Sequence, residues 1–165
     1  MHSHAPDSSY GLICGPVLNV ENQCERVLRT LPRWFGVESS LLEYARNTRH
    51  MTTFVAELDG EVVAFISLQR HFPAAWEVNC IAVSDAHRGR EFGKRLHEKA
   101  EKWLVSQCAT VLQVKTLAET HPSLEYAQTR AFYEAIGYKA LEVFPTLWAP
   151  HLPVLQLVKV LAHRP

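Results

Sequence analysis

Apolar residues recur along the chain in two patterns, short runs that are typical of strands and longer stretches with helical spacing. The runs predict strands at residues 12–20, 53–58, 62–70, 75–83, 109–117, 138–144 and 154–161. Helical spacing predicts helices that begin at Asn22, near Ser39 and within residues 85–96, and a last helix over residues 125–136. Strands and helices that alternate in this order predict a mixed sheet covered by helices.

Turn residues predict several boundaries of these elements. Asp59-Gly60 separates two of the strands and is the dipeptide that a tight hairpin prefers. Pro32 bends or ends the first helix, because proline cannot donate a helical hydrogen bond. Ser40 followed by Glu43 predicts a capping box at the second helix. Gly137 is expected to end the last helix, since glycine accepts the left-handed cap conformation.

The composition is that of one globular domain. A chain of 165 residues that is 47% hydrophobic can bury one core. The 17 Lys and Arg residues balance the 17 Asp and Glu residues, so no global charge favours a nucleic acid or an anionic membrane as partner. No apolar run approaches the roughly 20 residues that a membrane helix needs. We expect a soluble, cytoplasmic protein with a flexible leader (residues 1–10) that lacks secretory features, followed by one domain (residues 11–165).

Cysteines and histidines show no spacing that is typical of a metal site. The four cysteines form no CxxC motif, and the nine histidines form no HxxxH pair or Cys/His cluster. We therefore expect reduced thiols and no bound metal.

The stretch DAHRGREFGKRL, residues 85–96, joins a predicted strand to a predicted helix. Unpaired amides and the positive end of a helix dipole meet at such a turn. The turn carries four cations (Arg88, Arg90, Lys94 and Arg95), which Glu91 offsets only in part. The local excess of positive charge suits phosphate groups. The simpler alternative is a solvated helix start with scattered charges.

This region resembles the GNAT superfamily of acyl-CoA-dependent N-acyltransferases. Their pyrophosphate loop reads (Q/R)xxGx(G/A) after a strand, and residues 88–93, RGREFG, occupy that pattern. Two N-terminal helices, a hairpin and the late helix segment TRAFYEAIGY (residues 129–138) extend the resemblance over roughly residues 11–161. It implies an α/β fold with a single-domain, mixed, mostly antiparallel twisted sheet that is flanked by helices and splayed at its central strands.

The resemblance also implies a site for acetyl-CoA as cosubstrate. The strand backbone that would pair with the pantetheine arm belongs to Ile81, Ala82 and Val83. The loop that would hold the pyrophosphate comprises Arg88, Gly89, Arg90, Glu91, Phe92, Gly93 and Lys94. Glu91 departs from the family, which usually has the first motif glycine there. A carboxylate in contact with the diphosphate would be repelled by about 1–4 kcal/mol, so we expect Glu91 to point elsewhere, in a first helical turn where the dipole favours it.

Amine acylation needs a base, because an amine with a pKa of about 10.4 is almost entirely protonated at neutral pH. Alternation along the strand before the loop predicts that four side chains share one face: Glu77, Asn79, Ile81 and Val83. By resemblance, Glu77 would act as the base through a water molecule. Alternatively, Glu77 is a strand-end residue that faces solvent and takes no part in catalysis. His71 and His121 are the other candidates for the base.

Tyr133 occupies the tyrosine position of the family's late helix, and the resemblance implies that its phenol protonates or hydrogen-bonds the leaving CoA thiolate. Spacing alone would make Tyr133 a core residue on one stripe with Tyr126, Thr129 and Ile136. The family often has an asparagine where this chain has Tyr126.

The resemblance places the acceptor pocket between the N-terminal helices and the late loops. Its candidate residues are Trp34, Phe35, Tyr44, His71, Asn79, His121 and Trp148, several of which predict an apolar or aromatic wall. The predicted acceptor is an amine-bearing small molecule or peptide, whose identity the residues leave open, and a homodimer is compatible with the fold. The alternative to an N-acetyltransferase is a non-catalytic acyl-CoA-binding sensor or regulatory domain. A P-loop hydrolase is disfavoured, because GxxxxGK(S/T) does not occur.

Overall fold

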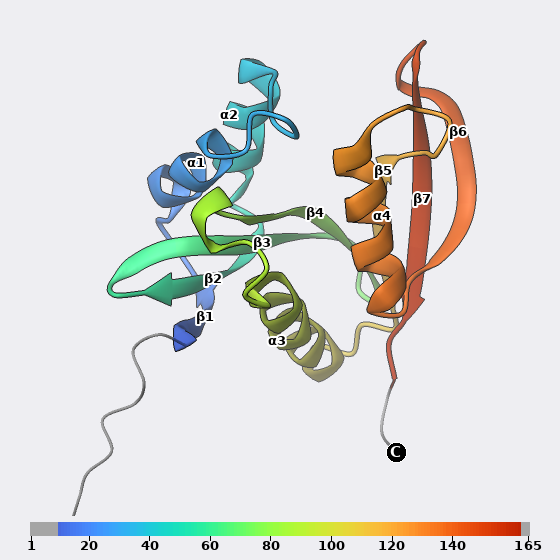
Figure 1. Ribbon diagram of the computed structural model, residues 1–165. Coiled ribbons are helices and arrows are strands. Elements are labelled where there is room, and N and C mark those ends of the chain that lie inside the picture. Colours follow the sequence, from blue (N-terminus) through green and yellow to red (C-terminus); the bar gives the residue numbers. More distant parts are fainter. Residues whose placement is uncertain (1–9, 163–165) are drawn as a thin grey trace, which may run out of the picture.

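The computed structural model describes residues 10–162, and residues 1–9 of the predicted leader lie outside them (Figure 1). The strands are β1 (Leu12–Val17), β2 (Thr52–Leu58), β3 (Glu61–Phe72), β4 (Ala75–Val83), β5 (Val111–Leu117), β6 (Lys139–Ala149) and β7 (Leu152–Val160). The α-helices are α1 (Glu21–Arg29), α2 (Glu38–Asn47), α3 (Phe92–Ser106) and α4 (Leu124–Ala135).

All of these strands form one sheet in the order β1-β2-β3-β4-β5-β7-β6. Strands β4 and β5 pair in parallel, and the other neighbours pair antiparallel. The parallel pair follows from its crossover, since α3 carries the chain from the end of β4 back to the start of β5. The predicted fold class, a mixed and mostly antiparallel sheet flanked by helices, is confirmed.

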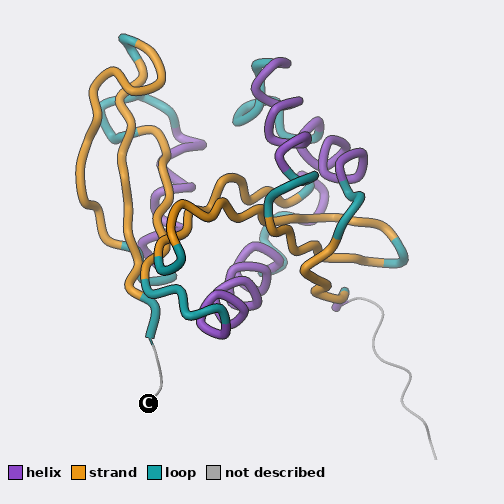
Figure 2. Tube along the Cα trace, turned by 180° about the vertical axis from the view of Figure 1, so that it is seen from behind, coloured by secondary structure: helices purple, strands orange, loops and turns teal. Residues whose placement is uncertain are grey.

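The sheet opens between its two central strands. Strands β4 and β5 are paired from Ala75 opposite Val111 to Val78 opposite Val114, and the pairing ends there. Beyond Val78, β4 keeps its bonds to β3 on one side, and on the other side it has no strand partner among residues 10–162. The two halves of the sheet diverge from this point, which both ribbon and tube views show (Figures 1 and 2). The predicted splay is confirmed.

A β-bulge in β4 lies at the point where the splay begins. Ser67 of β3 pairs with Cys80 and Leu68 pairs with Val78, so Asn79 is the extra residue. The bulge reverses the alternation of side chains. Ile81 and Val83 consequently pack against the same core cluster as Trp76 and Val78, and Glu77 lies on the opposite face. The prediction that Glu77 shares a face with Ile81 and Val83 is therefore wrong.

Helices cover both faces of the sheet with two separate core clusters. Consecutive residues Phe54 and Val55 of β2 enter different clusters, which places the clusters on opposite faces. One cluster includes Leu28 of α1 and Leu41 of α2. The other joins side chains of α3 and α4, including Leu96, Leu104 and Tyr133. The N-terminal helices and the later helices thus approach the splay from opposite sides (Figure 1).

Element boundaries differ from the predictions at several places; β1, for example, ends at Val17 and not at residue 20. Helix α2 begins at Glu38 without a side-chain cap, so Ser40 lies inside the helix and the predicted capping box is wrong. Strand β6 runs through Pro145 to Ala149, where a connection was predicted, because an edge strand can accommodate a proline that donates no ladder hydrogen bond. Gly137 follows α4 with φ of 102°, the left-handed conformation expected of it.

Candidate active site

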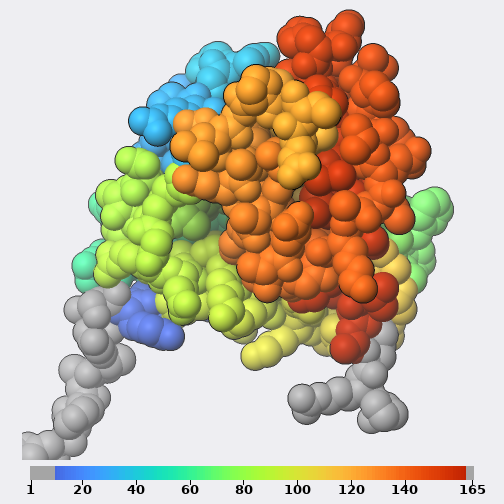
Figure 3. Space-filling model, turned by 45° about the vertical axis from the view of Figure 1, so that its right-hand side comes forward, coloured from blue at the N-terminus to red at the C-terminus, as the bar shows by residue number. Residues whose placement is uncertain are grey.

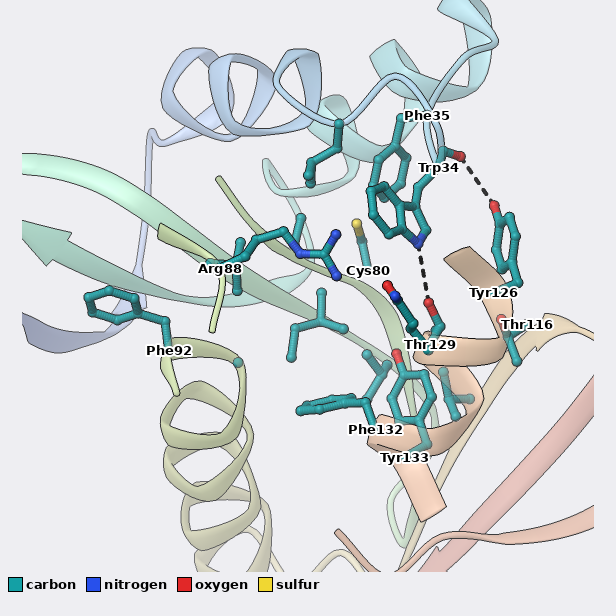
Figure 4. Close-up of a pocket in the computed structure, with 18 of the residues that line it drawn as sticks. Trp34, Phe35, Cys80, Arg88, Phe92, Thr116, Tyr126, Thr129, Phe132 and Tyr133 are labelled. Atoms are coloured by element: carbon teal, nitrogen blue, oxygen red, sulfur yellow. Dashed lines mark hydrogen bonds between the residues drawn. The ribbon is translucent and has the colours of Figure 1, made fainter. Parts of the chain in front are cut away.

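A cavity with a volume of about 490 Å³ occupies the splay. It is bordered by β4 and β5, the α1–α2 connection, the start of α3, helix α4 and the tip of β6. In the space-filling view, α4 and the loop before α3 face each other across the surface of this region (Figure 3). We call the part beside Arg88 and Phe92 the loop end, and the part beside Trp34, Phe35 and Tyr126 the aromatic end (Figure 4). With this end we group Tyr44, which packs against Phe35, and Trp148, which also borders the cavity.

Main-chain amides dominate the loop end. Helix α3 begins at Phe92, and Arg95 N donates to Glu91 O at 3.0 Å as its first helical bond. Within residues 10–162, no main-chain carbonyl accepts from the preceding amides of Glu91, Phe92, Gly93 and Lys94. Unpaired amides and the helix dipole together make such a terminus an anion site.

Glu91 has φ of 63°, in the left-handed region, and precedes the first turn of α3. Its predicted place inside that turn is wrong by one residue. A left-handed conformation costs a residue other than glycine about 1–2 kcal/mol, which explains physically why a glycine suits this position. Gly93 needs no such freedom. A Cβ there would lie 3.6 Å from the Phe132 ring, which is ordinary contact.

The four cations predicted at the loop have different roles. Arg88 lies with its guanidinium carbon 4.2 Å from the centre of the Trp34 ring and extends over the cavity (Figure 4). Lys94 also borders the cavity, whereas Arg90 lies 5.9 Å from the Phe92 ring and outside the cavity lining. Arg95 is directed to the start of β1, where it donates to Gly11 O at 3.0 Å. The charge available to an anion is therefore smaller than the sequence suggested.

Strand β4 supplies the floor of the cavity beside this loop. Ile81, Ala82 and Val83 border the cavity, and their edge toward β5 has no strand partner. Free amides and carbonyls on such an edge can pair with an extended ligand that carries amide groups.

Tyr133 joins the core to the cavity. Its ring packs against those of Phe132 and Tyr138 with centroids 5.3 and 5.2 Å away. The side chain is only 4% exposed, yet it borders the cavity and its hydroxyl is directed toward Thr129 (Figure 4). Burial, with smaller contributions from Cys80 and Tyr44, raises the pKa of Tyr133 well above its ordinary value. The phenol is therefore neutral at physiological pH and able to donate a hydrogen bond.

Glu77 lies in a cluster of polar side chains behind the cavity wall. Its Oε1 accepts from Lys115 Nζ at 2.8 Å, and its Oε2 lies 2.5 Å from His71 Nε2 and 3.2 Å from Gln113 Nε2. Glu77 as a whole residue is 9% exposed. Lys115 borders the cavity, but Glu77 and His71 do not. The structure thus brings Glu77 and His71 together and separates both from Tyr133.

The aromatic end is tied across the splay by Trp34. Its Nε1 donates to Thr129 Oγ1 at 3.3 Å, and its carbonyl accepts from Tyr126 Oη at 3.1 Å (Figure 4). Asn79 borders the cavity and accepts from Asn47 Nδ2 at 3.3 Å, whereas His121 lies outside the lining. Phe35 and Tyr44 pack edge to face with centroids 5.6 Å apart. The aromatic residues predicted for the acceptor pocket, Trp34, Phe35, Tyr44 and Trp148, all border the cavity, and Tyr126 of α4, which was not predicted there, joins them.

Two polar groups at the cavity escaped the sequence analysis. Thr116 is 3% exposed, and its Oγ1 has no hydrogen-bond partner within residues 10–162. The same holds for Nδ1 of His87, which borders the loop end. Both atoms are shielded from solvent. Nothing in a sequence marks such atoms, because their lack of a partner is a property of the folded chain.

Membrane-spanning helices and metal sites were both sought in the described part of the chain. None of its helices combines the length and the apolar character that crossing a membrane requires. Within residues 10–162, His, Cys, Asp and Glu side chains form no group of three or more that is placed to hold a metal ion.

Comparison with known proteins relates this geometry to a family. Residues 21–138 match the model of the acetyltransferase (GNAT) family. A search of curated protein sequences finds no match.

Several solved structures share the fold. Aminoglycoside 6′-acetyltransferase type Ii is 26% identical, with a TM-score of 0.72 over 93% of this chain and 99% of that one. An aminoglycoside 6′-N-acetyltransferase complexed with coenzyme A is 21% identical, with a TM-score of 0.71 over the same shares. The ribosomal-protein-S18-alanine N-acetyltransferase from Escherichia coli is 16% identical, with a TM-score of 0.73 over 94% of this chain and 96% of that one.

Proposed function

Because the chain belongs to the acetyltransferase (GNAT) family, we propose that it transfers an acetyl group from acetyl-CoA to a primary amine by direct attack in a ternary complex. One observation carries the proposal: the unpaired amides at the start of α3 and the unpaired edge of β4 border the same cavity. The amides suit a diphosphate, and the strand edge suits the amide groups of a pantetheine arm.

The loop end would hold the nucleotide part of CoA. The amides of Glu91 to Lys94 would donate to the diphosphate, with Arg88 and Lys94 adding positive charge. Arg88 would exchange its contact with Trp34 for a phosphate, or keep both, since a guanidinium can stack on a ring and donate in its plane at once. His87 Nδ1 would gain its missing partner from the same ligand.

The pantetheine arm would then run along Ile81 to Val83 and bring the thioester to Tyr133. The amine nitrogen attacks the thioester carbonyl carbon, the C–N bond forms, and the C–S bond breaks. The leaving thiolate accepts a hydrogen bond from the Tyr133 phenol, whose raised pKa keeps it neutral. The proton that the acylated nitrogen loses passes to the CoA sulfur, directly or through water.

The proton of the incoming ammonium needs a different acceptor. We assign this role to Glu77, which would accept the proton through water. Lys115 borders the cavity and donates to the Glu77 carboxylate at 2.8 Å, so the carboxylate lies one side chain away from the cavity. His71, at 2.5 Å from the same carboxylate, would share the proton and pass it outward.

The proposal is tested in two steps with the purified full chain. Calorimetry with CoA measures binding, and thiol release from acetyl-CoA in the presence of an amine panel measures transfer. A Glu77→Gln, Tyr133→Phe double variant should bind CoA and lose transfer. Absence of CoA binding at millimolar concentration would refute the site itself.

A second candidate function is acyl-CoA binding without transfer. It is favoured by Glu91, which occupies the position where the family motif usually has a glycine. Both functions require CoA binding, and only the enzyme releases thiol with an amine.

A further inference from the structure

The aromatic end of the cavity has a chemical character that restricts the amine acceptor. Five half-buried or exposed aromatic residues border it: Trp34, Phe35, Tyr44, Tyr126 and Trp148. They come from the α1–α2 connection, α2, α4 and β6, so the ligand would meet rings from several directions. Flat apolar groups gain from such surfaces through area burial and through stacking or edge-to-face contact.

The residues that border the cavity carry little negative charge, although Glu43 and Glu77, which do not border it, act electrostatically on Tyr44 of the aromatic end. Among the described residues that border the cavity, Arg88, Lys94 and Lys115 are cationic and Glu91 alone carries a carboxylate. Glu91 belongs to the loop end, beside the start of α3. The Glu77 carboxylate lies behind the wall and is already paired with Lys115 at 2.8 Å.

A polycationic acceptor would therefore be poorly accommodated. Each ammonium group that leaves water needs a counter-charge, and the ionised group of β5 that borders the cavity is the cation Lys115. A single ammonium can rest over a ring face before it loses its proton, but several cannot.

We propose that the acceptor is a small primary amine with an aromatic or flat apolar body and one ionisable nitrogen, in contrast to a polyamine or aminoglycoside. This inference rests on the proposed acetyl transfer. It differs from what the fold relationship alone would suggest, since the structure that is 26% identical is an aminoglycoside 6′-acetyltransferase.

The test compares kcat/KM for acetyl transfer from acetyl-CoA to 2-phenylethylamine and to kanamycin. We expect the aromatic amine to be favoured by about 100-fold, which is within the range that one pocket can discriminate. A preference for kanamycin would overturn the inference and leave acetyl transfer standing. Transfer to neither amine, nor to any other amine of a broad panel, with CoA binding intact, would instead refute the proposed enzyme and the inference with it.

A pair of matched variants tests the charge argument separately. Lys115→Met removes the cation that neutralises Glu77 and should narrow the preference for the aromatic amine by about 10-fold, because the carboxylate can then face a cationic ligand. Lys159→Met is the control. Lys159 forms a 2.9 Å ion pair with Glu101, similar in length and in lysine exposure to the pair of Lys115 with Glu77. Neither Lys159 nor Glu101 borders the cavity.

Binding provides a readout that does not depend on turnover. Calorimetry on the complex of the protein with CoA should show 2-phenylethylamine binding that Trp148→Ala weakens about 10-fold, since the truncation removes one ring of the wall. Equal preference ratios in Lys115→Met and Lys159→Met, together with undiminished binding in Trp148→Ala, would overturn the inference.

Discussion

The two ends of the cavity are built from different parts of the chain. The loop end consists of consecutive residues whose main-chain amides converge at the start of α3. The aromatic end consists of side chains from four separate elements, held together by contacts such as Trp34 to Thr129. A local main-chain site keeps its chemistry through many side-chain changes, whereas an assembled side-chain site changes with each of them. This difference suits a protein that uses a constant donor of acetyl groups and an acceptor of its own.

Tyr133 lies between the two ends, and its substitution should have the largest effect on transfer. Tyr133→Phe is expected to lower turnover by about 10- to 1,000-fold, because the thiolate leaves without a hydrogen-bond donor. CoA affinity should stay within about threefold, since the amides of the loop end are untouched. Single-turnover kinetics with acetyl-CoA measures the effect.

Tyr138→Phe is the matched control for this prediction. Tyr138 is a neighbouring buried phenol whose hydroxyl lies 2.7 Å from His97 Nε2, outside the cavity lining. Its loss should lower stability and leave turnover unchanged. A Tyr133→Phe protein with the turnover of the wild type would remove this phenol from the mechanism.

Gly93 tests the loop end alone. Gly93→Asp places a carboxylate among the amides that would hold the diphosphate and should weaken CoA binding by about 30-fold, or about 2 kcal/mol. The acidic residue favours the start of a helix, so the fold should persist. Gly93→Ala is the control, because its Cβ would meet the Phe132 ring at an ordinary 3.6 Å. Equal CoA affinities for the two variants in calorimetry would place the diphosphate elsewhere.

The tyrosines at the aromatic end and beneath it predict how stability depends on pH. Burial raises the pKa of Tyr44, Tyr126, Tyr133 and Tyr138 in the folded protein. Below the unfolded value of about 10 both states hold these protons, and above it the unfolded chain loses them first. Each such tyrosine should therefore lower the free energy of unfolding by up to about 1.4 kcal/mol per pH unit above pH 10.

Urea denaturation of the wild type and of Tyr133→Phe between pH 9 and 11 checks this expectation. The variant should lose stability less steeply with pH. Identical slopes would show that Tyr133 ionises as readily in the folded protein as in the unfolded chain.

Glu91 gives the smallest expected effect. Glu91→Gly relieves a left-handed residue and should change stability by no more than about 1 kcal/mol, since the relief is offset by the added freedom of the unfolded chain. CoA affinity should be unchanged or higher once a carboxylate has left the loop. Thermal unfolding and calorimetry measure both quantities, and a large loss of affinity would contradict the alignment of residues 88–93 with the pyrophosphate loop.

Sequence patterns predicted the fold and the loop end because both depend on local signals. Asp59-Gly60 and the helical spacing of Phe92, Leu96 and Ala100 each report on a few neighbouring residues. The hairpin and α3 formed where these signals stand.

The aromatic end and the surroundings of Glu77 were harder to predict. The single extra residue Asn79 reversed the faces of β4, and alternation cannot reveal a bulge. The partners of Glu77, which include Lys115 and Gln113, come from a strand that is remote in sequence. Long-range pairing of this kind, like the missing partner of Thr116, is decided by tertiary packing.

The bulge at Asn79 divides β4 into two short segments whose side chains alternate in opposite phase. In a version of β4 without that residue, Cys80 and Ala82 would exchange sides with Ile81 and Val83, and each helical layer would receive the other's side chains. One extra residue thus exchanges the two faces of a continuous strand. The first half of β4 pairs with both of its neighbours, and the second half pairs with β3 and leaves its other backbone edge free beside the cavity.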